Sequence, residues 1–184
     1  MKCSLMIQGT ASFVGKTVFT LAIGRILSKK GYRVAPFKSQ NMSLNSRVIQ
    51  DHREIAWAQY FQALSIGEEP SFHMNPILLK PIGNKKTQVI VHGRQWKILD
   101  YKDYYKYHDY LWTKVVESIE ELYKKYDLLI IEGAGSPAEI NLYKYEIVNM
   151  RVASYLNSPV LLIGDIERGG VFASLWGTWS LVEH

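Results

Sequence analysis

The residues best suited to chemistry in this sequence are a lysine and a threonine at the end of a glycine-bounded stretch, residues 9–17 (Gly-Thr-Ala-Ser-Phe-Val-Gly-Lys-Thr). At the start of a helix, the backbone N–H groups of such a stretch can surround an anion at the positive end of the helix dipole. Lys16 can then reach the β- and γ-phosphates of a nucleotide, and the Thr17 hydroxyl can ligate Mg²⁺. The alternative is a tight strand-to-helix turn with a solvated lysine. The predicted nucleotide contacts are Gly9, Thr10, Ser12, Val14, Gly15, Lys16 and Thr17.

This chemistry requires a strand before the loop and a helix behind it, and the sequence predicts both. Residues 4–8 form a short apolar run bounded by glycine, as in a buried parallel strand. Apolar residues then recur at helical spacing from Val18 to Leu27, and a basic turn followed by Gly31 ends the helix. Five residues separate the first glycine from Gly-Lys, one more than usual, so the loop is an uncommon version of the phosphate-binding motif.

A carboxylate forms the second chemical centre, because Glu132 follows a run of four apolar residues, 128–131. An ionised carboxylate at the end of a buried strand is costly unless a cation lies beside it, and Mg²⁺ held by Thr17 would supply that cation. We therefore expect Glu132 to be a metal ligand; the alternative is an acid at the strand end that faces water. Glu54 is expected in the first turn of a helix over residues 54–64, where its charge favours the helix dipole.

Polar segments follow two predicted strands at the edge where open α/β sheets bind ligands. A strand over residues 33–37 ends in Lys38, and residues 38–46 form a loop dense in amides and hydroxyls. A second polar loop, residues 136–142, lies at the same edge. These side chains could hydrogen-bond a polar substrate. A self-satisfied turn is the alternative for the first loop, because Ser and Asn favour turns on their own.

The remaining patterns complete one α/β domain over residues 1–184. A short strand or extended edge is expected over residues 74–81, and strands are expected over residues 88–93 and 159–164. A helical pattern begins at Val171 with no strand behind it, which indicates that a larger protein has been cut.

A tyrosine-rich stretch, residues 101–110, alternates aromatic and charged side chains, as in segments that stack nucleic-acid bases. Helical spacing continues from Leu111 to Leu122, so an amphipathic helix and its approach are the favoured interpretation. His92 and His108 share no metal-ligand spacing and are expected to be structural or solvated.

Composition limits the classes of protein further. Hydrophobic residues make up 47% and charged residues 21% of the chain, and no apolar run could span a membrane. The start leads directly into a strand without a signal peptide, which predicts a cytoplasmic location. The net charge of +5 comes from scattered basic residues and fits an anionic nucleotide or polycarboxylate better than a nucleic acid. Cys3, the only cysteine, is expected to be a small buried hydrophobe.

Six motifs in order resemble the N-terminal domain of the cobyric acid synthase family, which is related to dethiobiotin synthetase and cobyrinic acid a,c-diamide synthase. The resemblance implies a P-loop α/β fold, with a parallel sheet and helices on both faces. It also implies that ATP and Mg²⁺ activate side-chain carboxylates of a corrinoid as acyl phosphates, which ammonia from glutamine converts to amides in cobalamin biosynthesis. The motifs span residues 9–17, 35–46, 74–81, 89–94, 130–142 and 164–174.

The family's functional positions can be carried over to matching residues. By resemblance, Lys16 and Thr17 are the phosphate lysine and the metal hydroxyl, and Glu132 is the metal carboxylate. Lys38 matches a lysine that faces the phosphate and carboxylate being joined, and Glu54 lies where dethiobiotin synthetases have an acidic metal ligand. The residues implied on the corrinoid side are Gln40, Asn41, Asn45, Ser136, Glu139 and Asn141.

The family's glutaminase domain, with its nucleophilic Cys and His, has no counterpart in this sequence. The resemblance therefore implies that such a domain supplies ammonia, and that this chain alone could use only free ammonia. A dethiobiotin synthetase remains an alternative, because it would share the phosphate loop and the Glu-Gly-Ala-Gly motif. A MinD- or ParA-type ATPase is the second alternative. The phosphate loop of that type of ATPase has an extra lysine, whereas this chain has Gly9-Thr10-Ala11 there. The sequence leaves open whether the chain forms a homodimer.

Overall fold

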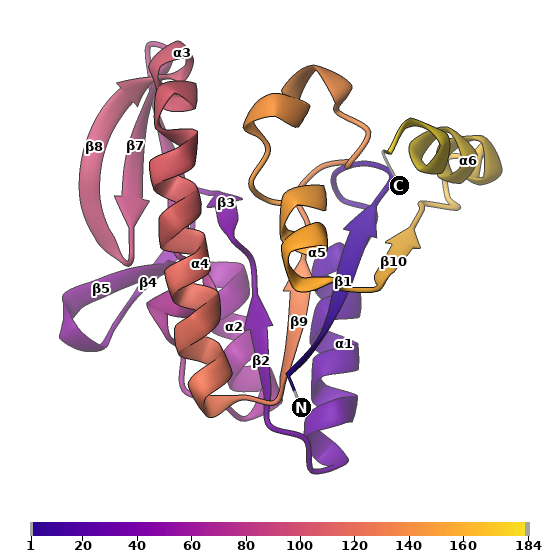
Figure 1. Cartoon of the computed structure of the whole chain (residues 1–184), viewed down its shortest axis with the longest axis horizontal. Coiled ribbons are helices and arrows are strands. Elements are labelled where there is room, and N and C mark those ends of the chain that lie inside the picture. Colours follow the sequence, from indigo (N-terminus) through magenta and orange to yellow (C-terminus); the bar gives the residue numbers. More distant parts are fainter. Residues whose placement is uncertain (1, 183–184) are drawn as a thin grey trace.

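The computed structural model describes residues 2–182, and its centre is a four-stranded, entirely parallel sheet of order β10-β1-β9-β2 (Figure 1). All four strands were predicted as short apolar runs. They end at one edge of the sheet, where the phosphate loop follows β1. The strands are β1 (Cys3–Gly9), β2 (Val34–Phe37), β9 (Leu128–Glu132) and β10 (Val160–Ile163).

Helices cover both faces of this sheet, as predicted (Figure 1). Successive strand residues point to opposite faces. Ile130 therefore packs with Ile66 in the cluster on one face, whereas Leu129 joins Val115 and Val152 in the main core on the other. The helices are α1 (Lys16–Lys29) and α2 (Trp57–Ile66) on the first face and α4 (His108–Lys125) and α5 (Met150–Leu156) on the second, while α6 (Val171–Leu181) follows β10.

A second sheet of order β3-β6-β7-β8 packs into the main core, and the sequence predicted only part of it. Its β3 and β6 are parallel, whereas β6, β7 and β8 form an antiparallel meander. The expectation of one parallel sheet was therefore incomplete. The last strand was missed because residues 94–100 alternate poorly between apolar and polar residues. The strands are β3 (Gln40–Met42), β6 (Ile77–Gly83), β7 (Lys86–Val91) and β8 (Arg94–Asp100).

The chain between β2 and α2 corrects two predictions. It contains β3 and an antiparallel hairpin of β4 (Ser46–Ile49) and β5 (Arg53–Ala56). The predicted loop over residues 38–46 contains β3, and the helix predicted from Glu54 begins only at Trp57. Glu54 lies in β5 opposite Val48, so it is not in the first turn of a helix. Helical spacing misled the prediction, because strand pairing with residues 46–49 decides the conformation.

The remaining segments are short helices and turns. The tyrosine-rich stretch forms short helices that lead into α4, in agreement with the favoured interpretation. Cys3 is half-buried rather than buried. No helix among residues 2–182 has the length and apolar character needed to cross a bilayer. These short elements are η1 (Gln50–His52), η2 (Phe72–Met74), α3 (Tyr101–Tyr104), η3 (Tyr105–Tyr107) and η4 (Ile140–Tyr145).

Two histidines meet on a buried serine of α4, away from the sheet edge. The Nε2 atom of His92 lies 3.0 Å from the Lys114 carbonyl oxygen and 3.0 Å from Ser118 Oγ, and Ser118 Oγ lies 3.1 Å from His73 Nδ1. Since a carbonyl only accepts, His92 Nε2 carries hydrogen and the Ser118 hydroxyl can donate to an unprotonated His73. Burial, and next the neighbouring His92, lower the pKa of His73 from 6.5 to about 4.

This depressed pKa predicts a specific loss of stability in acid. His73 favours the folded state while neutral, so its contribution is present above pH 6.5 and is lost as the pH falls through about 4. Relative to a His73→Gln variant, the parent should lose about 1–2 kcal/mol more free energy of unfolding over this range, a value reduced for the half-exposed ring. Denaturant titrations at several pH values would measure it. His52→Gln, at an exposed histidine, is the control, and parallel curves for parent and His73→Gln would contradict the prediction.

Candidate functional site

The phosphate loop lies between β1 and α1, as the sequence predicted, and two glycines allow its shape. Gly15 precedes α1 with a φ of 101°, a conformation that L side chains rarely adopt. A Cβ atom on Gly9 would lie 2.4 Å from Val14 Cγ2 and 3.1 Å from Lys16 Nζ. Only a residue without a side chain lets the loop fold back over the end of β1. The backbone N–H of Thr10 donates to the Ile163 carbonyl at 2.9 Å, which ties the loop to β10.

Lys16 is folded back over the loop rather than extended into water. Its ammonium donates to the carbonyl of Ala11 at 2.7 Å and to that of Gly135 at 2.8 Å. Burial, and then the nearby charge of Lys38, lower the pKa of Lys16, and Glu132 partly opposes this effect. The alternative of a solvated lysine is therefore wrong. Lys16 is a buried cation held by two neutral carbonyl oxygens, so an anion could replace those contacts.

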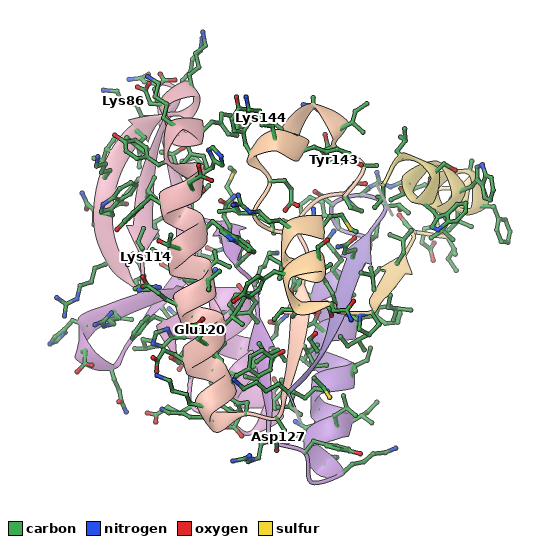
Figure 2. All side chains as sticks on the ribbon, in the orientation of Figure 1. Lys86, Lys114, Glu120, Asp127, Tyr143 and Lys144 are labelled. Carbon is green, nitrogen blue, oxygen red and sulfur yellow. The ribbon has the colours of Figure 1, made fainter. Side chains whose placement is uncertain are left out.

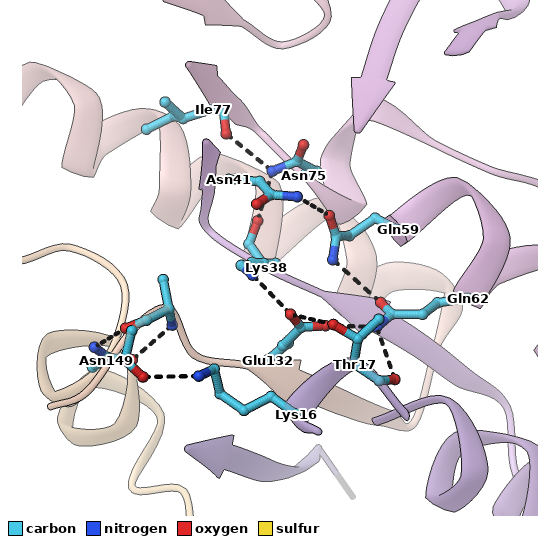
Figure 3. A network of polar contacts seen from close by, with 12 residues as sticks. Lys16, Thr17, Lys38, Asn41, Gln59, Gln62, Asn75, Ile77, Glu132 and Asn149 are labelled. Carbon is cyan, nitrogen blue, oxygen red and sulfur yellow. Dashed lines mark hydrogen bonds and ion pairs between the residues drawn. The ribbon is translucent and has the colours of Figure 1, made fainter. Parts of the chain in front are cut away.

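Glu132 is buried, with 2% of its surface exposed, and three side chains donate to its carboxylate (Figure 3). Thr17 Oγ1 and Lys38 Nζ both donate to Oε1, at 3.0 and 2.7 Å. Gln62 Nε2 donates to Oε2 at 2.7 Å. The alternative of an acid facing water is excluded. A buried carboxylate needs such a set of donors, because its desolvation otherwise outweighs the attraction of a single cation.

Two buried glutamines of α2 extend this network toward β3 (Figure 3). Gln59 Nε2 donates to Gln62 Oε1 at 3.4 Å, and Asn41 Nδ2 donates to Gln59 Oε1 at 3.0 Å. Both glutamines are fully buried. Sequence analysis did not identify them, although two glutamines three positions apart in a largely apolar helix were a usable signal. Together they form a chain of amides from Glu132 to Asn41.

Asn75 and Asn149 hold the backbone around these side chains, and sequence analysis missed both. Asn75 Nδ2 donates to the carbonyl oxygens of Lys38 and Ile77, each at 3.0 Å (Figure 3). Asn149 accepts from the Ala134 N–H at 3.0 Å and donates to the Ala134 carbonyl at 2.8 Å. A Cβ on Gly133 would lie 2.4 Å from Asn149 Oδ1, so the turn after Glu132 requires glycine there.

The predicted catalytic and metal residues, with the exception of Glu54, meet in one cleft of about 470 Å³. Lys16, Lys38, Thr17 and Glu132 all line it, so strand ends far apart in the sequence supply one site. A threonine hydroxyl next to a carboxylate is a fitting oxygen ligand pair for Mg²⁺. The other lining residues are Ser12, Phe13, Gly15, Asn41, Met42, Ala134 and Gly135.

The structure does not bring Glu54, the third predicted metal ligand, close to Thr17 and Glu132. Its carboxylate contacts Lys80 Nζ on β6 and Ser46 Oγ on β4. Within residues 2–182, no three His, Cys, Asp or Glu side chains gather in a group able to hold a metal ion.

Four of the six residues implied on the corrinoid side lie in or beside the phosphate cleft. Asn41 lines that cleft, and Gln40, Ser136 and Glu139 line an adjoining cleft of about 460 Å³. Asn45 lies instead in a separate pocket next to Trp57. Asn141 is exposed on η4 and lines neither of the two clefts. The structure therefore supports the placement of the sheet-edge loops but separates Asn45 and Asn141 from the others.

Comparison with known proteins matches residues 5–181 to the family described as "CbiA: CobQ/CobB/MinD/ParA nucleotide binding domain". The chain is 55% identical over 178 residues to a probable cobyric acid synthase of Methanocaldococcus jannaschii, a match that covers 97% of this chain and 36% of the relative. It is 54% identical over 179 residues to the cobyric acid synthase of Thermodesulfovibrio yellowstonii, with the same coverage. A probable cobyric acid synthase of Methanococcus voltae is 56% identical over 178 residues, which cover 78% of that relative. The chain thus spans about a third of the length of the first two.

The buried ion pair between Lys38 and Glu132 yields a stability prediction. Lys38→Met leaves the carboxylate without its cation and should lower the free energy of unfolding by about 3–5 kcal/mol in denaturant titrations at pH 7. Adding Glu132→Gln to that variant should recover part of the loss, because it removes the unpaired charge. Arg33→Met is the control, since Arg33 and Asp127 form an exposed pair at the other end of the sheet (Figure 2).

Arg33→Met should leave the free energy of unfolding nearly unchanged. Equal effects of Lys38→Met and Arg33→Met would contradict the inference that burial of Glu132 makes its cation indispensable.

Proposed function

This chain belongs to the CobQ/CobB/MinD/ParA family of nucleotide-binding domains, and from its similarity to cobyric acid synthases we propose that it is the ATP-dependent synthetase part of such an enzyme. Its reaction is the amidation of corrinoid side-chain carboxylates, which converts cobyrinic acid a,c-diamide to cobyric acid. The observation that carries the proposal is one cleft containing two lysines, a hydroxyl and a buried carboxylate. These groups suit the joining of a carboxylate to a phosphate.

The nucleotide's phosphates lie in the loop over residues 9–17, where backbone N–H groups and the start of α1 face them. Lys16 exchanges its two carbonyl contacts for phosphate oxygens. Thr17 and Glu132 would hold Mg²⁺, since their oxygens lie together in the cleft, 3.0 Å apart. Bound there, the ion would neutralise charge on the phosphates.

The acceptor carboxylate attacks the γ-phosphorus from the side of Lys38. An oxygen–phosphorus bond forms, the bond to ADP breaks, and an acyl phosphate results. Ammonia then attacks the acyl carbon, phosphate leaves, and the nitrogen loses a proton to give the amide. Lys16 and Lys38 offset the negative charge that gathers between two anions, so positioning and charge neutralisation carry the step.

Ammonia comes from a glutaminase domain in this proposal. The one cysteine in the sequence, Cys3, lies in β1, and its carbonyl accepts a hydrogen bond from the Tyr123 hydroxyl at 3.0 Å. A glutaminase nucleophile needs an activated, accessible thiolate, which a thiol within a central strand does not provide. Ammonium can replace that domain in a direct test.

The proposed function first requires that the nucleotide binds through Lys16. Lys16→Ala removes a charge-assisted phosphate contact and should weaken Mg²⁺–ATP binding by about 1.5–3 kcal/mol, more than a tenfold rise in Kd. Isothermal titration calorimetry measures the change. Lys30→Ala, at the exposed end of α1, is the matched control and should bind like the parent. Unchanged affinity in Lys16→Ala would mean that the loop does not hold phosphate through this lysine.

The reaction itself is tested by mixing the chain with ATP, Mg²⁺, cobyrinic acid a,c-diamide and a high concentration of ammonium, and following amide formation by mass spectrometry. We expect ATP-dependent conversion of carboxylates to amides, and much less of it with Glu132→Gln, because the metal-side charge is lost. Glutamine in place of ammonium should give none.

Three results would contradict the proposal. Amidation with glutamine alone would show that the ammonia source lies within this chain. Turnover of diaminononanoic acid would favour a dethiobiotin synthetase. ATP hydrolysis stimulated by membranes or DNA, without amide formation, would favour an ATPase of the MinD or ParA type.

A further inference from the structure

Three tyrosines from two segments of the chain line the cleft that adjoins the phosphate cleft. We name Tyr104, Tyr105 and Tyr145 the tyrosine wall. The ring centroids of Tyr105 and Tyr145 lie 4.9 Å apart, and those of Tyr104 and Tyr105 lie 5.9 Å apart. The wall thus joins the segment before α4 to η4, which projects beyond the sheet edge with Tyr143 and Lys144 (Figures 1 and 2).

The wall is held in place by contacts with Gln40 and His108. The Tyr104 hydroxyl donates to the Gln40 side-chain oxygen, and burial raises the pKa of Tyr104 well above its ordinary value, so it remains a neutral donor. The ring of His108 packs edge-on against Tyr145, with centroids 5.3 Å apart. Pre-positioned rings lose little freedom when a flat ligand binds against them.

The two clefts adjoin each other, because Met42, Ala134 and Gly135 line both. The Gly135 carbonyl accepts from Lys16, so the shared rim touches the phosphate lysine directly. A ligand whose body rests on the tyrosine wall can therefore extend an arm across this rim toward Lys16 and Lys38. The rest of the adjoining cleft is largely apolar, with Leu79, Pro137, Leu142, Ile147 and Val148 among its lining residues.

The direction of the bound nucleotide decides which ligand meets the wall. The candidate metal ligand Glu132 ends β9, and Lys38 follows β2, the edge strand next to β9. The metal and γ-phosphate end of a nucleotide thus points toward β9 and β2. The helix α3, which ends in Tyr104, lies on the β2 side of the sheet (Figure 1). The base then lies away from the wall, which leaves the wall to the acceptor.

We propose that the tyrosine wall binds one face of the corrin ring system, while a carboxylate-bearing arm crosses the Ala134–Gly135 rim to Lys16 and Lys38. This inference rests on the proposed function and deepens it by assigning specificity to residues outside the phosphate motifs. Flat conjugated rings stack well on aromatic side chains, and apolar contacts complete the surface. Gln40 and Ser136 at the edge of the cleft can hydrogen-bond amide arms.

The test is equilibrium binding of cobyrinic acid a,c-diamide, followed by the change in corrin absorbance, in parallel with calorimetric titration of Mg²⁺–ATP. Tyr105→Leu and Tyr145→Leu should each weaken corrinoid binding about three- to tenfold and leave ATP binding unchanged. Tyr105→Phe and Tyr145→Phe keep the rings and should bind like the parent. Tyr32→Leu, at an exposed tyrosine just before β2, is the control.

The possible failures are distinguishable. Corrinoid binding by the parent that the Leu variants leave unchanged would overturn the wall and keep the proposed function. Weaker ATP binding in the Leu variants would assign the wall to the nucleotide base and overturn the inference. A parent that binds ATP but no corrinoid would overturn the proposed function and this inference with it. Thermal unfolding monitored by circular dichroism identifies variants that fail to fold, and the Phe variants then decide whether loss of the ring is the cause.

Discussion

The burial of one carboxylate, that of Glu132, constrains the rest of the site. A charge with 2% of its surface exposed must receive hydrogen bonds from several directions, and each donor comes from a different element. Thr17 comes from α1, Gln62 from α2, and Lys38 from the residue that follows β2. The ends of β9 and β2 and the positions of both helices on one face of the sheet are thereby fixed relative to one another. The same contacts that satisfy the charge place the two lysines and the hydroxyl in one cleft.

The amides of Gln62, Gln59 and Asn41 form a chain of hydrogen bonds that all point toward the Glu132 carboxylate. Each amide offers both a donor and an acceptor, so the chain from Glu132 has a defined order: Gln62 donates to the carboxylate, Gln59 donates to Gln62, and Asn41 donates to Gln59. A buried amide that lost its neighbour would leave an unsatisfied polar group, which is costly. The orientation of the Glu132 carboxylate is therefore tied to β3, the strand whose residues line both clefts.

The sequence predicted that Lys16, Thr17 and Glu132 would lie close together, because phosphate-loop and strand-end residues are tied to local patterns. Lys16, Thr17 and Glu132 each stand at a fixed place beside an apolar run, and parallel strands bring such places to one edge. The partners of these residues depend on tertiary packing, so the spacing of Gln59 and Gln62 could mark two buried amides but could not show that Gln62 contacts Glu132. Glu54 was misplaced for the same reason, because the pairing of β4 with β5 overrode helical spacing. The tyrosine wall could not be predicted from the sequence for another reason. Tyr145 lies far along the chain from Tyr104 and Tyr105, and only the fold brings them together.

Charge balance explains why this cleft is suited to two anionic ligands at once. Lys16 and Lys38 carry two positive charges, and Glu132 supplies one negative charge to offset them. Burial, and then the charge of Lys38, lower the pKa of Lys16, and Glu132 opposes this effect only in part. Neutral carbonyl oxygens of Ala11 and Gly135 satisfy the ammonium of Lys16 only as hydrogen-bond acceptors. Phosphate oxygens would satisfy it as acceptors and as charges, so the site gains more from an anion than it loses in carbonyl contacts. One of those carbonyls belongs to Gly135, which lines both clefts, so the lysine that would favour phosphate also borders the adjoining cleft.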